Sequence, residues 1–254
     1  MSAALRADGV ALRYPGAAQP VLASFNLALN SGEVVAILGP SGVGKSSLLR
    51  VLAGLEAPTA GRVLVDGAPL NRAHPRVAIA FQDPCLLPWL SLEKNVGFGL
   101  DFRDQPRMTG AERQARVDAA IEEVGLAYAR HSHPARLSGG MAQRTALARC
   151  LARNPNVLLL DEPFGALDEV TRTEMQHLLL KVVADLHTAT LLVTHDIDEA
   201  LLLADRVLLL GGAPAHVVGE WAVDLPKPRE EFVAELGTLR IDILRTLRAA
   251  MRRH

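Results

Sequence analysis

Residues 39–46 carry a pattern with one well-defined chemical use. They read Gly-Pro-Ser-Gly-Val-Gly-Lys-Ser, ending in Lys45 and Ser46. The glycines allow tight turns that aim backbone N–H groups at phosphate oxygens. The lysine would reach the β- and γ-phosphates, and the serine hydroxyl would bind Mg²⁺. The pattern predicts a site for a nucleoside triphosphate and no more, because many unrelated ATPases and GTPases share it.

A pair of carboxylates, Asp161 and Glu162, directly follows the apolar residues 157–160. Parallel strands present their sites at their carboxyl ends, so both side chains are expected at the edge of a sheet. Asp161 would hold the Mg²⁺ shell, and Glu162 would polarise the attacking water. The alternative, two solvated charges, does not explain why they follow an apolar run directly.

A second glycine-bearing segment, Leu-Ser-Gly-Gly, occupies residues 137–140 and precedes Met141. Ser138, Gly139 and Gly140 would present a hydroxyl and bare backbone N–H groups at the start of a helix. Such an arrangement suits a γ-phosphate.

The elements that must position these residues alternate between strands and helices. The apolar, β-branched run at 34–38 predicts a strand buried on both faces, as in a parallel sheet. A helix is predicted from Lys45 to a stop at Gly54. Together the patterns predict an α/β sheet flanked by helices. Further strands are predicted at 62–65, 77–81, 157–161, 191–194 and 207–210, and an antiparallel edge sheet at 10–14 and 25–29.

Helical patterns replace strand-like runs between Gln82 and about residue 154, notably at 111–124 and 141–153. A single crossover between parallel strands needs far fewer residues, so we predict an inserted helical subdomain that contains residues 137–140. The predicted division is a core of 5–82 and 155–220, a helical subdomain of 83–154, and a C-terminal segment of 226–254 with a helix over 229–253.

The composition limits the kinds of partner. The chain has 254 residues, with 27 basic and 28 acidic side chains and a formal net charge of −1. No long basic stripe interleaved with aromatic residues occurs, so we expect no nucleic acid partner. No apolar run approaches the roughly 18 residues that cross a bilayer. Cys85 and Cys150 lack CxxC spacing and fit a reducing, cytosolic compartment, with Cys150 as a buried apolar residue.

The phosphate loop, the Leu-Ser-Gly-Gly segment and the strand ending in Asp161 and Glu162 together resemble the ATP-binding cassette of ABC transporters, over residues 5–218. The resemblance implies one ATP-binding domain, 1–254, with the P-loop NTPase fold. That fold has a parallel-sheet core, an antiparallel β edge subdomain and an inserted helical subdomain. The cofactors implied are ATP and Mg²⁺, and the activity implied is ATP hydrolysis coupled to solute translocation.

The resemblance also assigns roles to single residues. Gln82 would contact Mg²⁺ and the attacking water, His195 would lie against the γ-phosphate, Tyr14 would stack on adenine, and Asp168 would touch a facing subunit. The catalytic set implied is Lys45, Gln82, Glu162 and His195. The Mg²⁺ ligands implied are Ser46, Gln82 and, through water, Asp161. The ATP-binding residues implied are Tyr14, Gly39, Pro40, Ser41, Gly42, Val43, Gly44, Lys45, Ser46 and Ser47.

Cassettes of this family pack head to tail, so that each ATP lies between the loop of one chain and the Leu-Ser-Gly-Gly segment of the other. One copy of each segment in this chain implies a homodimer, in which Ser138, Gly139 and Gly140 act in trans. The family most often has Gln where this chain has Met141, so the segment is expected to act through its backbone.

Residues 81–96 and 223–229 are similar to the importers for nitrate, taurine and aliphatic sulfonates, and Met141 favours the sulfonate members. This likeness implies a peripheral subunit on the cytoplasmic face of the inner membrane. Its partners would be two transmembrane permease subunits and, indirectly, a periplasmic solute-binding protein. The alternatives are a taurine or nitrate importer, an exporter motor, or a soluble ABC ATPase acting on ribosomes or DNA.

Two surfaces of the predicted structure can each be interpreted in two ways. The apolar residues of segment 82–89, which ends in Trp89, form either core beneath the helical subdomain or a groove for a short permease helix. The basic C-terminal helix, with Ile241 and Met251 on its apolar face, either packs on its own domain or touches anionic lipid.

Overall fold

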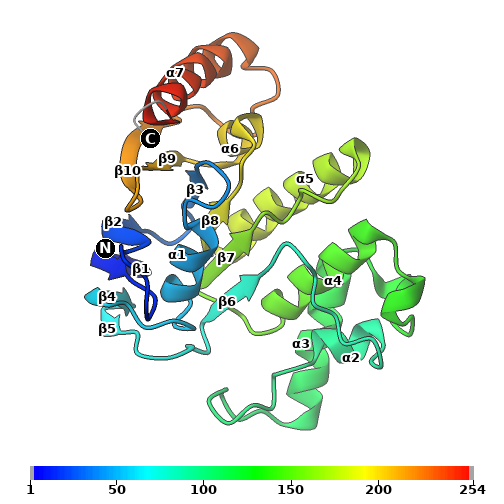
Figure 1. The fold of residues 1–254 in the computed structure, drawn as a ribbon. Helices are drawn as coiled ribbons and strands as arrows, with labels where there is room; N and C mark the ends of the chain where they lie inside the picture. Colours follow the sequence, from blue (N-terminus) through cyan, green and yellow to red (C-terminus); the bar gives the residue numbers. More distant parts are fainter. Residues whose placement is uncertain (1–2, 252–254) are drawn as a thin grey trace. The chain divides into compact units, whose positions relative to one another are not determined.

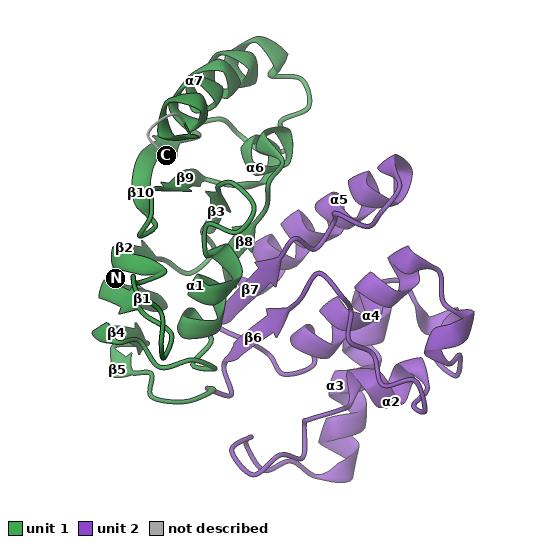
Figure 2. Ribbon diagram, viewed as in Figure 1, with its two compact units in different colours: residues 1–73, 189–254 green, residues 74–188 purple. Residues whose placement is uncertain are grey.

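The computed structural model describes residues 3–251 of the chain. They fall into two compact units (Figure 2). The terminal unit comprises residues 1–73 and 189–254, and the middle unit comprises residues 74–188. The predicted boundaries at 82/83 and 154/155 differ from these divisions, and the predicted domain scheme stays a prediction.

The first sheet of the terminal unit is antiparallel. Its strands, in spatial order, are β2 (Leu22–Leu29), β1 (Leu5–Leu12), β4 (Ala60–Val65) and β5 (Ala68–Pro69). Leu5 on β1 lies opposite Leu29 on β2 and Val65 on β4. All three are buried, as expected where alternate residues point into a core. The predicted antiparallel edge sheet is therefore confirmed.

The second sheet of the terminal unit carries the predicted phosphate loop. Its strands, in spatial order, are β10 (His216–Ala222), β9 (Arg206–Gly211), β3 (Val34–Leu38) and β8 (Ala189–Val193). β3 is parallel to β8 and β9, whereas β10 is antiparallel to β9. Every residue of β3 is buried, as the continuous apolar run predicts for a strand covered on both faces.

Helices complete the described part of the terminal unit (Figure 1). They are α1 (Lys45–Leu52), α6 (Ile197–Leu203) and α7 (Val233–Met251). α1 begins at the predicted residue. α7 packs against α6, β9 and β10.

The predicted C-terminal helix begins too early in the chain. Arg229 is not helical, and α7 starts only at Val233. The reason is that the Arg229 side chain is buried and binds backbone carbonyl groups. The predicted end of the helix, residues 252–253, lies outside the described residues.

The buried face of α7 also differs from the predicted one. Ile243 is fully buried, whereas Ile241 and Met251 are exposed. Asp242 accepts a hydrogen bond of 2.7 Å from the indole N–H of Trp221 on β10. These contacts support packing of α7 on its own domain.

The middle unit combines two strands with a group of helices. The strands β6 (Val77–Ala80) and β7 (Val157–Asp161) are parallel. The predicted helices at 111–124 and 141–153 are present with slightly shifted ends. The helical elements are α2 (Leu92–Val96), α3 (Gly110–Glu123), α4 (Gly139–Leu151), α5 (Glu169–Leu186), and the 3₁₀ turns η1 (Ala127–Ala129) and η2 (Pro134–Arg136).

Among residues 3–251, no helix has both the length and the apolar character that a membrane crossing requires.

Candidate nucleotide site

The segment 39–44 joins the carboxyl end of β3 to the first turn of α1. Gly44 is the N-cap of α1 and has a φ of 109°, a conformation that favours glycine. A Cβ atom at this position would also lie 2.7 Å from Val21 Cγ1. Both the backbone conformation and the space around it therefore require glycine here.

The N-terminus of α1 differs from those of α2 to α6. Within the described residues, no side chain caps α1. By contrast, a side-chain oxygen accepts a hydrogen bond from the first turn of each of α2 to α6. The first N–H groups of a helix have no partner within the helix, so an uncapped terminus behind a glycine-rich loop suits phosphate oxygens. The capping residues are Ser91, Thr109, Ser138, Asp168 and Asp196.

The Lys45 side chain bends back over the loop. Its Nζ atom donates to the carbonyl oxygens of Gly39, at 2.8 Å, and Pro40, at 3.1 Å. The side chain is 6% exposed. An ammonium group held in this position has a short way to move to the oxygens of a phosphate bound by the loop.

Two further predicted residues lie beside α1. The Tyr14 hydroxyl donates to the Ser47 hydroxyl at 3.1 Å, which brings these two predicted ATP-binding residues together. Ser46, the predicted Mg²⁺ ligand, lies exposed on the first turn of α1.

His195 follows β8 at the same sheet edge as the phosphate loop, because β8 is parallel to β3 and Val193 is paired with Ile37. Both neighbours of His195 are anchored. The Thr194 N–H donates to Ile37 O at 3.1 Å, and the Asp196 N–H donates to Thr194 Oγ1 at 3.0 Å. Asp196 in turn caps α6. The His195 side chain is exposed.

The middle unit brings together Gln82, which follows β6, and Glu162, which follows β7. A Cβ atom placed on Gly165 would lie 3.8 Å from Gln82 Nε2 and 3.9 Å from Glu162 Oε2, so both side chains approach one point. Asp161 is the last residue of β7 and is buried. Glu162 has a φ of 46°, and this left-handed turn ends the strand.

Residues that the sequence did not single out hold the backbone of segment 82–91. The Gln143 side chain on α4 donates to Gln82 O at 2.7 Å. Arg149, also on α4, donates to Pro84 O at 2.7 Å and Cys85 O at 2.9 Å. The fully buried Asn95 accepts from Leu87 N–H at 2.8 Å. Spacing alone offers no signal for these residues, because each binds a backbone group and not a second side chain.

Ser138 is the N-cap of α4, and its hydroxyl accepts a hydrogen bond from Met141 N–H at 3.3 Å. Ser138 and Gly139 are exposed, whereas Gly140 is buried. A Cβ atom on Gly140 would collide with the Thr171 side chain of α5. Gly140 is therefore required for packing within the chain, whereas Gly139 faces open space.

Asp168 is the N-cap of α5. Its carboxylate accepts from the Thr171 N–H at 3.0 Å and from the Thr171 hydroxyl at 2.8 Å. These hydrogen bonds, first the one from the amide and then the one from the hydroxyl, lower the pKa of Asp168 below its ordinary value. The residue has a structural role within its own chain, and the predicted contact with a second subunit stays a prediction.

Cys150 is buried on α4, as predicted. Burial raises the pKa of its thiol to about 11. The thiolate is the reactive form of cysteine, so Cys150 is chemically inert at neutral pH.

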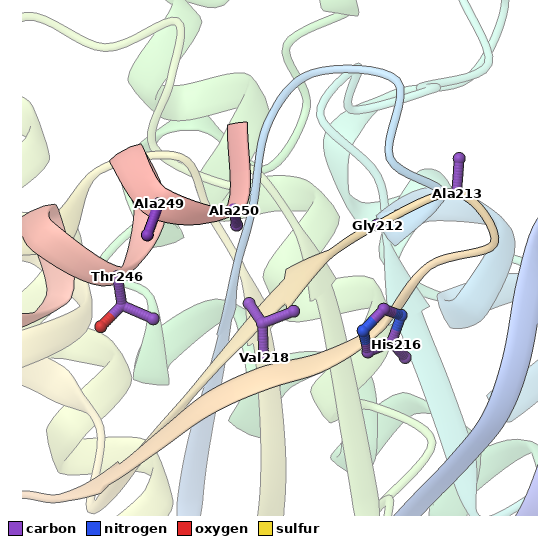
Figure 3. A pocket seen from close by; sticks show the side chains of 7 residues that line it. All are labelled: Gly212, Ala213, His216, Val218, Thr246, Ala249 and Ala250. Carbon is purple, nitrogen blue, oxygen red and sulfur yellow. The ribbon is translucent and has the colours of Figure 1, made fainter. Parts of the chain in front are cut away.

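A separate pocket of about 340 Å³ lies between the β9–β10 turn and α7 (Figure 3). Apart from Thr246 and His216, its lining consists of small or apolar residues. His216 Nδ1 lies 3.0 Å from Pro214 O. None of the predicted site residues lines this pocket.

Comparison with known proteins agrees with this arrangement. Residues 22–165 match the family described as ABC transporter. The aliphatic sulfonates import ATP-binding protein SsuB 2 of Burkholderia lata is 46% identical over 88% of this chain and 80% of the relative. The taurine import ATP-binding protein TauB of Chromobacterium violaceum is 47% identical over 85% of this chain and 82% of the relative. The nitrate import ATP-binding protein NrtD of Synechococcus elongatus is 41% identical over 94% of this chain and 91% of the relative.

Among solved structures, the ATP-binding cassette MJ0796, a dimer in a post-hydrolysis state with ADP and Pi, is 31% identical. The alignment covers 87% of this chain and all of that chain, with a TM-score of 0.76.

A buried parallel strand, a glycine-rich loop and an uncapped helix define a P-loop nucleotide-binding protein. The chain belongs to the ABC transporter family. The predicted fold class, the ATP-hydrolysing cassette of an importer and the nitrate, taurine and sulfonate branch are confirmed. The relatives do not support the ribosome- or DNA-directed ATPase.

Proposed function

We propose that this chain is the energy-coupling ATPase subunit of an importer for aliphatic sulfonates. The observation that carries its ATP chemistry is the uncapped N-terminus of α1 behind residues 39–44. The choice of sulfonates rests on Met141 and on the likeness of segments 81–96 and 223–229 to that branch. Taurine and nitrate are the competing solutes, since relatives named for them are similarly identical.

Residues of the terminal unit would bind the triphosphate. The loop N–H groups and Lys45 would hold its β- and γ-phosphates, and Tyr14 would stack on the adenine. Mg²⁺ prefers hard oxygen ligands, and the exposed Ser46 hydroxyl would provide one of them. The other proposed ligands are oxygens of Gln82 and, through water, of Asp161, both of the middle unit. When bound, the ion would neutralise charge that develops on the phosphate oxygens.

Residues that follow β6, β7 and β8 would carry the hydrolytic step. Glu162 would accept the proton of the attacking water, and the neighbouring Gln82 would orient that water. His195, held between Thr194 and Asp196, would keep the water and the leaving group in line.

We propose a homodimer with two equivalent ATP sites, in which Ser138, Gly139 and Gly140 of one chain serve the nucleotide of the other. The exposure of Ser138 and Gly139 in the single chain supports this assignment. ATP would stabilise the closed dimer because it contacts both chains only in that state. Asp168, which is also exposed, would lie in the dimer contact.

Segment 82–89 is proposed to receive a short helix from a permease subunit. Trp89 is 70% exposed, which argues against the alternative that it forms core. Gln143 and Arg149 connect the backbone of this segment to α4, the helix that begins at Ser138. A permease bound here would therefore sense the state of the nucleotide through α4.

Replacement of Trp89 by Ala should uncouple transport. A tryptophan that acts as a hot spot of an interface contributes about 2 kcal/mol or more to binding, so the permease would dissociate more readily from the variant. Co-purification of the permease should be lost, while ATP binding, measured with a fluorescent nucleotide, should remain at the parental level. The exposed Tyr128 of the same unit provides the control as Tyr128→Ala. Equal loss of permease and ATP binding in Trp89→Ala would contradict the proposal.

The partners and the solute can be tested together in native membranes. We expect a tagged chain to co-purify with a transmembrane permease, as a peripheral subunit at the cytoplasmic face of the inner membrane. ATPase activity of this complex should rise with a periplasmic binding protein loaded with an alkanesulfonate. Stronger stimulation by a binding protein loaded with taurine or nitrate would show that the importer carries that solute and not an aliphatic sulfonate. Recovery of ribosomes without a permease would contradict the proposal.

A further inference from the structure

Arg229 is a charged side chain enclosed in the core of the terminal unit. It is 2% exposed, and its guanidinium donates to four backbone carbonyl groups. The acceptors are the carbonyl oxygens of Leu201 at 2.9 Å, Val223 at 2.8 Å, Leu225 at 3.0 Å and Ala204. Arginine can satisfy so many acceptors because its planar group carries five N–H donors.

Two of these four carbonyl groups belong to the end of α6. Leu201 lies in the last turn of α6, and Ala204 is its C-cap. The last carbonyl groups of a helix have no partner within the helix and carry partial negative charge, so a cation stabilises them. Arg229 therefore serves as the C-terminal cap of α6.

The opposite end of α6 leads directly to His195. Asp196 caps the helix through hydrogen bonds from the N–H groups of Asp198 at 2.9 Å and Glu199 at 3.2 Å. α6 has only seven residues, so a shift at one end reaches the other. The position of the His195 backbone thus depends on how firmly α6 is held.

The C-terminal segment holds α6 at a second point as well. Arg240 on α7 forms an ion pair of 2.8 Å with Asp198 in the first turn of α6. Close to Arg229, Lys227 pairs with Asp205 at 2.7 Å, and Asp205 also accepts from Val34 N–H at 2.8 Å. Asp205 directly follows the C-cap of α6 and also lies 3.7 Å from the Arg229 guanidinium. Lys227 and Arg229 thus share Asp205, but only Arg229 binds the carbonyl groups at the end of α6.

We propose that Arg229 is a positioning residue that acts through α6 to hold His195 in its productive place. The inference rests on the proposed role of His195 in hydrolysis. The proposal assigns a function to segment 223–229, which contains no residue of the proposed ATP site. Because catalysis depends on alignment, a small displacement of His195 would slow turnover without weakening ATP binding.

The test compares ATP hydrolysis by the purified full-length chain and its variants. Arg229→Lys keeps the positive charge but not the fork of donors. We expect kcat to fall about tenfold, with KM for ATP within about twofold of the parental value. Hydrogen exchange of the amides of residues 195–203 should become faster in the same variant.

Two controls separate this effect from general destabilisation. Lys227→Met removes the shorter of the two ion pairs of Asp205 but leaves the hydrogen bonds of Arg229 to the end of α6, so kcat and exchange in α6 should stay at the parental level. Val63→Ala opens a cavity in the antiparallel sheet and should lower the melting temperature without changing kcat at 25 °C.

His195→Ala in the same assay separates a failure of the proposed role of His195 from a failure of the proposed role of Arg229. If His195→Ala retains the parental kcat, the proposed role of His195 is wrong. If His195→Ala is inactive but Arg229→Lys retains the parental kcat, or changes only KM, then Arg229 does not position His195. Loss of kcat in Arg229→Lys with a parental kcat in both controls would support the proposal.

Discussion

The helices α1 and α4 both begin with glycine-bearing segments, but their N-termini differ. α1 has no side-chain cap within the described residues, and it directly follows the loop 39–44. α4 is capped by Ser138, whose hydroxyl accepts from Met141 N–H. The first terminus has no side-chain cap, which agrees with its proposed role of receiving a phosphate within its own chain. The second is stable without a ligand, as a surface must be if it meets ATP only when another chain arrives.

The largest expected effect comes from Glu162→Gln, which keeps the shape of the side chain and removes its charge. Hydrolysis should fall by about 10²–10⁴-fold, because a general base contributes about that much. ATP should still bind, and closed dimers should accumulate. Hydrogen exchange can compare the two N-termini directly. ATP should slow the exchange of the amides of loop 39–46 in monomers and dimers, but it should slow the exchange of the first turn of α4 in dimers only. Parental hydrolysis in this variant would show that Glu162 is not the base.

Lys45→Ala should have the next largest effect, at the α1 terminus alone. Hydrolysis should fall by about 10²-fold or more, because a charged donor to the phosphates is lost. ATP binding by the isolated chain, measured by calorimetry, should weaken as well. Lys181→Ala, which removes a surface lysine paired with Glu123, is the matched control. Parental ATP affinity in Lys45→Ala would contradict the assignment of this loop as the phosphate-binding site.

Ser138→Ala should act at the α4 terminus and leave the α1 terminus intact. Loss of the cap should cost about 1 kcal/mol in the free energy of unfolding. Hydrolysis should fall about tenfold or more, whereas ATP affinity of the single chain should be unchanged. Ser91→Ala removes the N-cap of α2 and should show the stability loss without the loss of hydrolysis. Weaker ATP binding by single Ser138→Ala chains would place this residue in its own chain's site.

The smallest expected effect concerns a third terminus, that of α5. The pKa of Asp168 is lowered in the folded chain, so its stabilising contribution is complete above its unfolded pKa of about 3.9 and is lost as the pH falls through the folded value. Asp168→Asn keeps a capping side chain but does not titrate. The difference in melting temperature between this variant and the parent should therefore shrink between pH 5 and pH 3. For the hydroxyl cap of Ser138 the corresponding difference should not depend on pH, and a constant difference for Asp168 would contradict the assignment.

Local patterns were enough to predict the elements that carry the candidate site. The apolar runs at 34–38 and 157–161 correspond to β3 and β7, and α1 begins at Lys45 as predicted. These features depend on neighbouring residues: a strand buried on both faces needs a continuous apolar run, and the loop needs glycine where φ is positive.

Features that depend on distant contacts were missed or misplaced. Arg229 was predicted to begin a helix, because nothing in the local sequence reveals the four carbonyl groups that surround it. The periodicity of the last helix predicted Ile241 on the apolar face, but the fold buries Ile243. Gln143 was not singled out because its partner, Gln82 O, is a backbone atom far away in the sequence.

Mixing two impaired variants tests most directly whether the two helix termini serve one ATP from different chains. Lys45→Ala and Ser138→Ala each impair both sites of a homodimer. In a mixed dimer, however, both changes fall in one site and the other site is intact. Mixing equal amounts should therefore restore about a quarter of the parental hydrolysis, since half of the dimers are mixed and each has one working site. If the mixture stays as impaired as its components, the two termini do not form composite sites across the dimer.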